Sequence, residues 1–213
     1  MHLKLIKLIQ LNKQKLKVGI SVGDPNGIGI EVILKSFQNP EMLNLFNPLI
    51  FANIKIIEYQ MRHFNINLEL NSIQTIEKIC NDRVNVFNIS MDNFKHTFGE
   101  STSQGARVAL KSLLASTKAI KSGEVEALVT GPINKKNILS DKFNFVGHTE
   151  FLSDCFSSKS LMFMIGKNLK IGLLTDHIPI DEVSSSVTKK LLREKILKMI
   201  KSMQNDFLIP KPK

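Results

Sequence analysis

The sequence predicts an α/β fold built on a largely parallel sheet. Short apolar segments typical of buried strands alternate with longer amphipathic segments typical of helices over most of the chain. Polar turns marked by Gly or Pro follow several of the expected strands. Because sheets of this kind carry their functional groups at the carboxyl ends of the strands, we expect the functional site in these turns.

Composition excludes several other classes of protein. The chain has 213 residues, of which 43% are hydrophobic and 23% charged, so it is neither disordered nor fibrous. No apolar run approaches the roughly 18 residues that a membrane span needs. Two cysteines, Cys80 and Cys155, are too few for a disulfide scaffold or a thiolate zinc site. We therefore expect a soluble, cytoplasmic protein without a membrane partner.

The net charge of +10 raises the question of nucleic-acid binding, and its distribution argues against it. The positive excess lies in residues 1–20 and 187–213, whereas the stretch between them is close to neutral. Lysine greatly outnumbers arginine, and the chain has no Trp and one Tyr for base stacking. We expect solvated lysines and no nucleic-acid partner.

The first half of the chain alternates between the two patterns. Residues 1–16 are expected to form a loose N-terminal extension rather than a targeting peptide. The following elements are expected in order: a strand at 16–22, a helix at 28–37, a strand at 49–52 and a helix at 54–64. In the second helix, Ile56, Ile57, Met61 and Phe64 recur at helical spacing.

The second half is expected to continue the alternation. Residues 66–100 hold short apolar clusters without a clear period, including 84–87, and predict an edge strand and loops. Ser103 is expected to cap a long helix with its hydroxyl, and Gly123 to end it. The remaining expected elements are a strand at 127–130, a pair of strands at 161–165 and 170–175, and a helix that starts at Ser186 or Thr188.

Two Gly/Pro-marked turns could hold an anion. The segment GDPNGIGIE at 23–31 contains Asp24 and could present backbone N–H groups at a helix N-terminus, although a purely structural turn explains it equally well. The segment TGPINKK at 130–136 delivers Lys135 at the mouth of the next helix. A phosphate or carboxylate would suit this lysine, and an exposed lysine pair is the alternative.

Two further segments carry histidines. In FVGHTEF at 145–151, Thr149 could cap a helix that begins at Glu150 and leave His148 free to face a cleft, and a purely structural histidine is the equal alternative. In LLTDHIPI at 173–180, His177 follows a buried strand and could ligate a metal through a ring nitrogen, with Asp176 beside it. The other three histidines are expected to be ordinary surface residues, namely His2, His63 and His96.

The order and spacing of these four segments resemble one family, that of 4-hydroxythreonine-4-phosphate dehydrogenase, from about Lys17 to the last residue. The resemblance implies an isocitrate/isopropylmalate-dehydrogenase-like α/β/α fold in two domains, incomplete at the C-terminus. The expected parts are the extension at 1–16, a first α/β domain at 17–128 and a partial second domain at 129–213. It also implies a homodimer.

The resemblance further implies a reaction and a set of site residues. The reaction is NAD- or NADP-dependent oxidation of 4-phosphooxy-L-threonine to 2-amino-3-oxo-4-phosphooxybutanoate, which decarboxylates to 3-amino-2-oxopropyl phosphate in pyridoxal 5'-phosphate (vitamin B6) biosynthesis. A divalent metal (Zn, Mg or Co) takes part. By motif position, His148 and Thr149 match the substrate-binding pair, and His177 matches a metal ligand. The candidate cleft residues are Lys135, Asp24 and Asp176.

The chain departs from the family at its C-terminal end. Family members are longer by roughly half, and their additional stretch supplies two more metal-binding histidines, whereas no histidine follows His177 here. We therefore expect a truncated chain that is inactive alone. Two alternatives stay open: a paralogue that oxidises four-carbon sugar-acid phosphates (threonate or erythronate 4-phosphate), and a non-catalytic remnant that acts as a binding or dimerisation partner.

Overall fold

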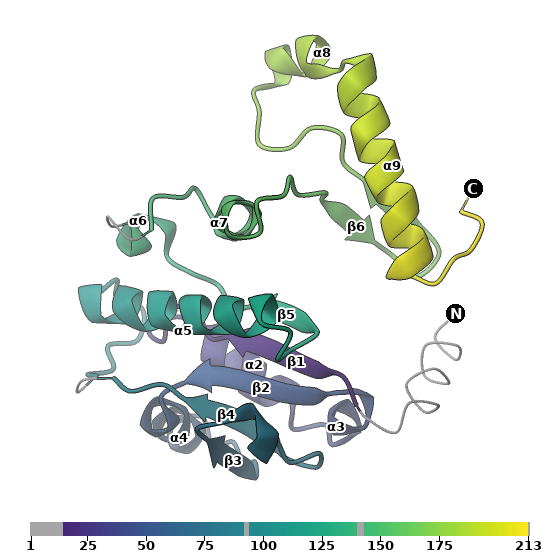
Figure 1. Ribbon diagram of the computed structural model, residues 1–213. Helices are drawn as coiled ribbons and strands as arrows, with labels where there is room; N and C mark the ends of the chain where they lie inside the picture. The colour runs from purple at the N-terminus through teal and green to yellow at the C-terminus, as the bar shows by residue number, and fades with distance from the viewer. Residues whose placement is uncertain (1–14, 92–93, 140–142, 213) are drawn as a thin grey trace. The chain divides into compact units, whose positions relative to one another are not determined.

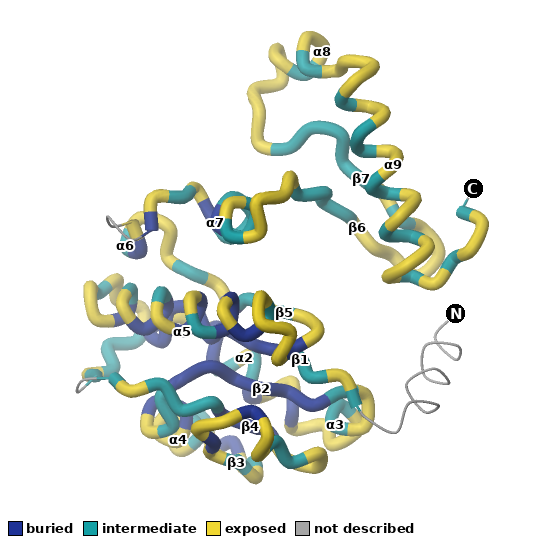
Figure 2. Tube along the Cα trace, in the orientation of Figure 1, coloured by how far each residue is buried: buried dark blue, intermediate teal, exposed yellow. Residues whose placement is uncertain are grey.

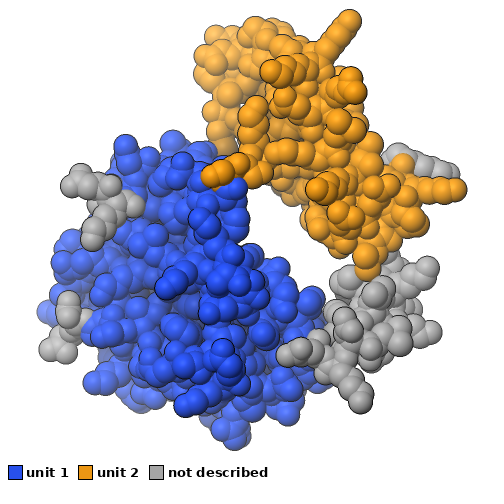
Figure 3. All heavy atoms as spheres, in the orientation of Figure 1, with its two compact units in different colours: residues 1–156 blue, residues 157–213 orange. Residues whose placement is uncertain are grey.

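The computed structural model describes residues 15–91, 94–139 and 143–212. The chain divides into two compact units, one ending at Phe156 and the other comprising residues 157–213 (Figure 3). Apart from its last two residues, the predicted N-terminal extension lies outside the described residues, as does His2. The domain boundary expected at residue 128 concerns the complete fold of the family and stays a prediction.

The first unit is built on a five-stranded sheet with the strand order β3-β4-β2-β1-β5 (Figure 1). All four strand pairs are parallel, which confirms the predicted fold class. The strands are β1 (Lys17–Ser21), β2 (Asn47–Ala52), β3 (Leu70–Ile73), β4 (Val84–Asn88) and β5 (Ala127–Thr130). The main connecting helices are α2 (Gly29–Ser36), α3 (Glu41–Leu45), α4 (Ile54–His63) and α5 (Ser103–Lys121), with a 3₁₀ turn at Ile76–Lys78.

Helices cover both faces of this sheet, so its central strands are buried on both sides. Residues of α2 and α4 pack with Ile50 and Ala52 of β2 in one core cluster. Leu49 and Phe51, which alternate with them, pack in a second cluster with Ala119 of α5 on the opposite face. Figure 2 shows β1 and β2 as the most continuously buried part of the unit. Because helices cover both faces of the sheet, side chains on both faces of these strands are apolar, and the strands appear in the sequence as unbroken apolar runs.

Most expected elements of the first unit are confirmed within one or two residues, with one addition and one error. Residues 66–100 hold the expected edge strand, β3, and also a second strand, β4, which lies inside it and pairs with it in parallel. The short, polar sequence of β3 (LNSI) gives no strand pattern of its own. The cap of α5 is Thr102, whose side chain accepts from Gly105 N, and not Ser103. The end at Gly123, with φ +74°, is as expected.

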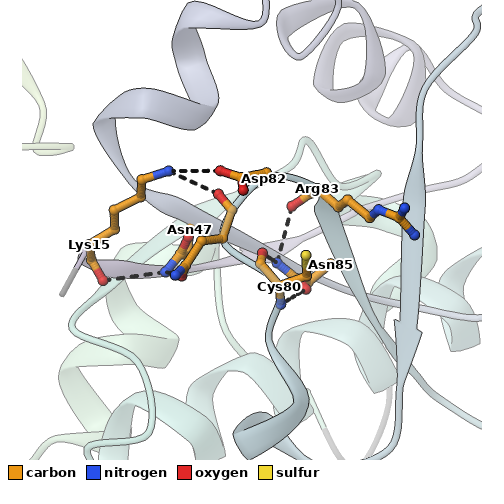
Figure 4. A network of polar contacts seen from close by, with 7 residues as sticks. Lys15, Asn47, Cys80, Asp82, Arg83 and Asn85 are labelled. Carbon is orange, nitrogen blue, oxygen red and sulfur yellow. Dashed lines mark hydrogen bonds and ion pairs between the residues drawn. The ribbon is translucent and has the colours of Figure 1, made fainter.

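A polar network centred on Asn85 lies at the end of the sheet where its parallel strands begin (Figure 4). This side chain is fully buried in β4. Its Oδ1 accepts from Cys80 N and from Asn71 Nδ2, each at 2.8 Å, and its Nδ2 donates to Cys80 O at 3.0 Å and Pro48 O at 3.2 Å. Because the donors and acceptors of the buried amide are all used within the protein, we assign this network a structural role.

The second unit is small and open. It contains an antiparallel pair, β6 (Phe163–Ile165) and β7 (Lys170–Gly172), a 3₁₀ turn (Ile180–Glu182), the short helix α8 (Val183–Ser186) and the long helix α9 (Lys189–Asn205). Thr188 caps α9 by accepting from Leu191 N, as one of the two expected starts. No described residue of this unit is buried (Figure 2). Within the described ranges of the whole chain, every helix is too short or too polar to span a membrane.

Candidate functional site

The turns that follow β1 and β5 lie against each other, because these strands are neighbours and end at the same edge of the sheet. Asp24 N donates to Pro132 O at 3.0 Å. Gly23 has a φ of +70°, and a Cβ there would lie only 2.1 Å from Pro132 O. A Cβ on Gly131 would lie 2.6 Å from Val22 O. The glycines of the first two motifs are therefore required for this close approach of backbones.

A third segment, just before α5, is bonded to the first turn through Asn26. Thr97 N donates to Asn26 Oδ1 at 3.0 Å, and Gly99 N donates to Asn26 O at 2.8 Å. Asn26 Nδ2 donates to Thr102 Oγ1, the same oxygen that caps α5. Sequence reasoning missed this segment because it holds no glycine-rich or histidine motif; the threonine cap before α5 was its only signal.

Asp24 occupies the position that an anion would take in the first turn. Its Oδ1 accepts from Asn26 N at 3.0 Å, and a Cβ on Gly105 would lie 2.6 Å from that oxygen, so the carboxylate lies against the first turn of α5. The positive end of the helix favours a carboxylate there. The N–H groups of Asp24, Asn26 and Gly27 are all bonded within the protein. These three N–H groups are therefore satisfied within the protein, and a ligand role for this motif stays a prediction.

A cavity of about 300 Å³ opens between these three segments. It is lined by Asp24, Asn26, Gly27, Ile28, Gly99, Glu100, Ser101, Pro132, Ile133 and Asn134. Asn134 fixes one wall by donating to Ser101 Oγ at 3.1 Å, and its Oδ1 accepts from Asn137 N to cap α6 (Lys135–Ile138). This places Lys135 as the first residue of α6, beside the cavity wall.

His148 is the first residue of α7 (His148–Cys155). The expected cap by Thr149 is wrong: the cap position is Gly147, which is fully extended, and no side chain caps this helix. Thr149 therefore lies inside the first turn. Phe151 anchors α7 by packing with Phe143 in a buried cluster, at a ring-centroid distance of 5.3 Å.

His148 is half-buried, and its Nε2, which is buried, has no hydrogen-bond partner in the described protein. Burial, and secondarily the charge of Lys135, lower the pKa of His148 below its ordinary value. The ring is therefore neutral at pH 7. An unpartnered buried nitrogen is rare in a folded protein and calls for a partner that the described residues do not supply, such as a bound water or a ligand.

Lys135 and Glu150 approach the same turn. A Cβ on Gly147 would lie 3.8 Å from Lys135 Nζ and 3.6 Å from Glu150 Oε2. The fold thus brings together the lysine of the second motif and the histidine of the third, which are 13 positions apart in the sequence. A neutral imidazole beside an ammonium group can accept a hydrogen bond from a hydroxyl while the ammonium attracts an anionic substituent.

Asp176 and His177 belong to the second unit, where they follow β7. His177 has a φ of +54°, in the left-handed region that residues other than glycine adopt infrequently. Backbone conformations of this kind occur preferentially at functional loops. Among residues 15–91, 94–139 and 143–212, however, no group of three or more His, Cys, Asp or Glu side chains could hold a metal ion. These residues do not form a metal centre by themselves, and we derive no step through a metal.

Of the two other described histidines, His63 is exposed as expected and His96 is not an ordinary surface residue. His96 stacks on Tyr59 with ring centroids 3.8 Å apart, and its Nε2 is buried without a partner. Aromatic packing that depends on the fold brings these rings together, so the sequence context of His96 did not reveal it.

Comparison with known proteins identifies relatives over nearly the whole chain. The chain is 32% identical over 205 residues to 4-hydroxythreonine-4-phosphate dehydrogenase from Bacteroides thetaiotaomicron, covering 95% of this chain and 56% of that protein. It is 29% identical over 195 residues to a protein provisionally named D-threonate 4-phosphate dehydrogenase from Clostridium botulinum, covering 88% of this chain and 57% of that protein. The chain thus spans a little over half the length of these relatives.

Solved structures agree on the fold. A crystal structure of a 4-hydroxythreonine-4-phosphate dehydrogenase from Burkholderia phymatum matches with a TM-score of 0.81 at 20% identity, over 90% of this chain and 59% of that one. The implied isocitrate-dehydrogenase-like α/β/α fold is confirmed by this match and by a similar one to a Salmonella typhimurium structure. The family model for "Pyridoxal phosphate biosynthetic protein PdxA" matches residues 44–213. The chain therefore belongs to the PdxA family of pyridoxal phosphate biosynthetic proteins.

Proposed function

We propose that this chain carries part of the substrate site of an NAD- or NADP-dependent dehydrogenase that acts on 4-phosphooxy-L-threonine. The observation that carries the proposal is the unpartnered, buried Nε2 of His148 beside Lys135. The family membership and the name of the Bacteroides relative support the same reaction class. In that reaction, the C3 hydrogen leaves as hydride to the nicotinamide ring, and the hydroxyl proton goes to solvent or a base.

The proposed roles follow from the chemistry of each side chain. Neutral His148 accepts the hydrogen bond of a substrate hydroxyl, and the Thr149 hydroxyl, one residue further into α7, provides a second polar contact. Lys135 attracts the carboxylate or phosphate of the substrate. His177 is the ligand that this chain would contribute to a divalent metal whose other ligands lie outside the described residues. A cytoplasmic homodimer remains part of the proposal.

The test is a chimera in which residues 1–213 are joined to the part of the Bacteroides relative that lies beyond the matched region. We expect the chimera to form NADH or NADPH from 4-phosphooxy-L-threonine in the presence of divalent metal, and residues 1–213 alone to form none. His148→Asn should lower kcat/KM by roughly tenfold or more, because a buried hydrogen bond to the substrate is lost. Lys118→Gln, on the exposed face of α5, is the matched control and should leave kcat/KM unchanged.

The Clostridium relative favours a second candidate substrate, D-threonate 4-phosphate. This compound carries a hydroxyl at C2 where 4-phosphooxy-L-threonine carries an ammonium group. The ratio of kcat/KM for the two compounds in the chimera separates the candidates, and a ratio in favour of the hydroxy acid would replace the first proposal with the second. A folded chimera that oxidises neither compound would favour the non-catalytic alternative.

A further inference from the structure

A second cavity, of about 690 Å³, lies in the first unit at the carboxyl ends of β2 and β4. Its volume is within the range of small-molecule sites in proteins. None of the residues discussed under the proposed function lines it. The lining residues are Asn53, Lys55, Ile56, Tyr59, Arg62, Met91, Phe94, Lys95 and His96.

The position of this cavity in the sheet is one at which α/β proteins bind ligands. β2 and β4 are adjacent and parallel. The chain leaves β2 into α4 on one face of the sheet, and after β4 it packs Met91 and Phe94 on that same face before it reaches α5 on the other face. The cavity therefore lies between α4 and the segment that follows β4, and the region outside the carboxyl ends of parallel strands is the preferred ligand position of open sheets.

The charged side chains among the described lining residues are all positive. Lys55, Arg62 and Lys95 contribute three cations, and no aspartate or glutamate is among the described lining residues. Lys55, Tyr59 and Arg62 follow each other at i, i+4 and i+7 and so share one face of α4. The first N–H groups of this helix are already bonded, since Lys55 N donates to Asn53 Oδ1. An anion in this cavity would therefore be held by side chains rather than by the helix terminus.

Aromatic rings form the other part of the wall. Tyr59 and His96 are stacked at an interplanar angle of 16°, and Phe94 meets His96 edge-on with centroids 4.8 Å apart. Burial, and secondarily the charge of His63, lower the pKa of His96, so the imidazole is neutral at pH 7. Its buried Nε2 has no hydrogen-bond partner among the described residues. Such a wall suits a flat ring that also offers hydrogen-bonding atoms.

We propose that this cavity is a binding site for a small phosphate monoester that carries a planar heteroaromatic ring, as a nucleoside monophosphate does. Lys55 and Arg62 bind the phosphate, with Lys95 adding positive charge, and the Tyr59–His96 wall receives the ring. The site consists of residues from α4 and the segment that follows β4, so it does not depend on the proposed dehydrogenase activity.

Calorimetric titration of the full chain, carried on a soluble fusion partner, tests the proposal with AMP as the probe. The fusion partner alone is the blank. We expect saturable binding of AMP, with adenosine and ribose 5-phosphate each binding at least about fivefold more weakly because each lacks one of the two recognised groups. Lys55→Gln and Arg62→Gln should each weaken AMP binding by about fivefold. Lys118→Gln removes an equally exposed helical lysine from α5 and should have no effect.

Tyr59→Leu distinguishes ring recognition from simple attraction of an anion. Because Tyr59 is 41% exposed, we expect this variant to fold and to lose AMP affinity while ribose 5-phosphate binds as before. The proposal is overturned if AMP shows no saturable binding below about 5 mM. It is equally overturned if Lys55→Gln and Arg62→Gln bind AMP like the unmodified chain, or if ribose 5-phosphate or inorganic phosphate binds as tightly as AMP.

Discussion

The two compact units of the chain differ in what holds them together. Every buried residue of the described chain lies in the first unit, whose core includes Phe51, Leu34 and Ile57 with 0–1% of their surfaces exposed. In the second unit, Ile165 is 60% exposed and Leu197 is 57% exposed. Both units have regular helices and strands with capped ends. The comparison teaches that secondary structure forms in both, whereas only the first unit has a core of its own.

The second unit has the strand and helix patterns of a folded domain, but many of its large apolar side chains are exposed, among them Ile165, Ile180 and Leu197. Exposed apolar surface of this extent is typical of a region that binds other protein. The relatives extend well beyond the part that this chain covers. We therefore regard residues 157–213 as dependent on further protein for their stability.

The largest expected effect comes from separating the units. Residues 1–156 expressed alone should unfold in urea in one cooperative transition, because the double-sided sheet and its helices are intact. Residues 157–213 alone should show no cooperative transition by circular dichroism. A cooperative transition in the isolated second unit would show that it is self-sufficient, and the contrast between the two units would be lost.

A matched pair of isoleucine substitutions sharpens the same contrast. Ile57→Ala removes a fully buried side chain from α4 and should lower the free energy of unfolding by about 2–5 kcal/mol. Ile196→Ala removes a side chain of α9 that is 45% exposed and should change it by less than about 0.5 kcal/mol. Urea denaturation of the full chain measures both. Equal effects would mean that α9 is packed as tightly as α4.

Substitutions at a matched pair of glycines test whether the close packing of the first unit extends to the turns that follow β1 and β5. Gly23 and Gly123 both have positive φ, but a Cβ would collide with Pro132 O at Gly23 and would meet nothing within 4 Å at Gly123. Gly123→Ala should cost about 1 kcal/mol in free energy of unfolding, and Gly23→Ala about 2 kcal/mol more. If urea denaturation gave similar losses of unfolding free energy for both variants, the turns after β1 and β5 would accommodate an added methyl group at little cost.

The smallest expected effect concerns the protonation of His148. Its folded-state pKa is lowered, so the unfolded chain binds more protons in the window between that value and the ordinary value of 6.5. The contribution of His148 to stability is therefore complete above this window and is lost as the pH falls through it. Lys135→Gln should raise the pKa of His148, and Lys118→Gln should not. An NMR titration of the His148 ring protons checks this, and an unchanged pKa in Lys135→Gln would remove Lys135 from the site.

How much could be predicted from the sequence depends on the range of the interactions involved. Local patterns were sufficient for β1, β2, α4 and the extent of α5, although the cap of α5 is one residue before the expected Ser103. The inner position of β4 depends on β3, whose LNSI sequence has no strand pattern of its own. The wrong cap at Thr149 has a similar cause, because an extended Gly147 starts α7 two residues earlier than expected.

The site itself was predictable only in part. The motifs predicted His148, Lys135 and Asp24 as site residues. They did not predict that Lys135 would lie beside the imidazole, or that the Asp24 carboxylate would accept a hydrogen bond from its own turn. The segment around Thr97 and the stacking of His96 on Tyr59 arise from contacts between distant parts of the chain, for which a single sequence carries no pattern. Binding roles for Thr149, Asp176 and His177 remain predictions.

The most direct test of the account is whether the self-sufficient first unit already presents His148 to the substrate. Residues 1–156 are titrated with 4-phosphooxy-L-threonine while the ring signals of His148 are followed by NMR. We expect these signals to shift in a saturable manner, and the shift to be strongly weakened in Lys135→Gln but retained in Lys118→Gln. Ring signals that stay unchanged at saturating substrate, in a fragment that is folded, would contradict the assignment of His148 to the substrate site.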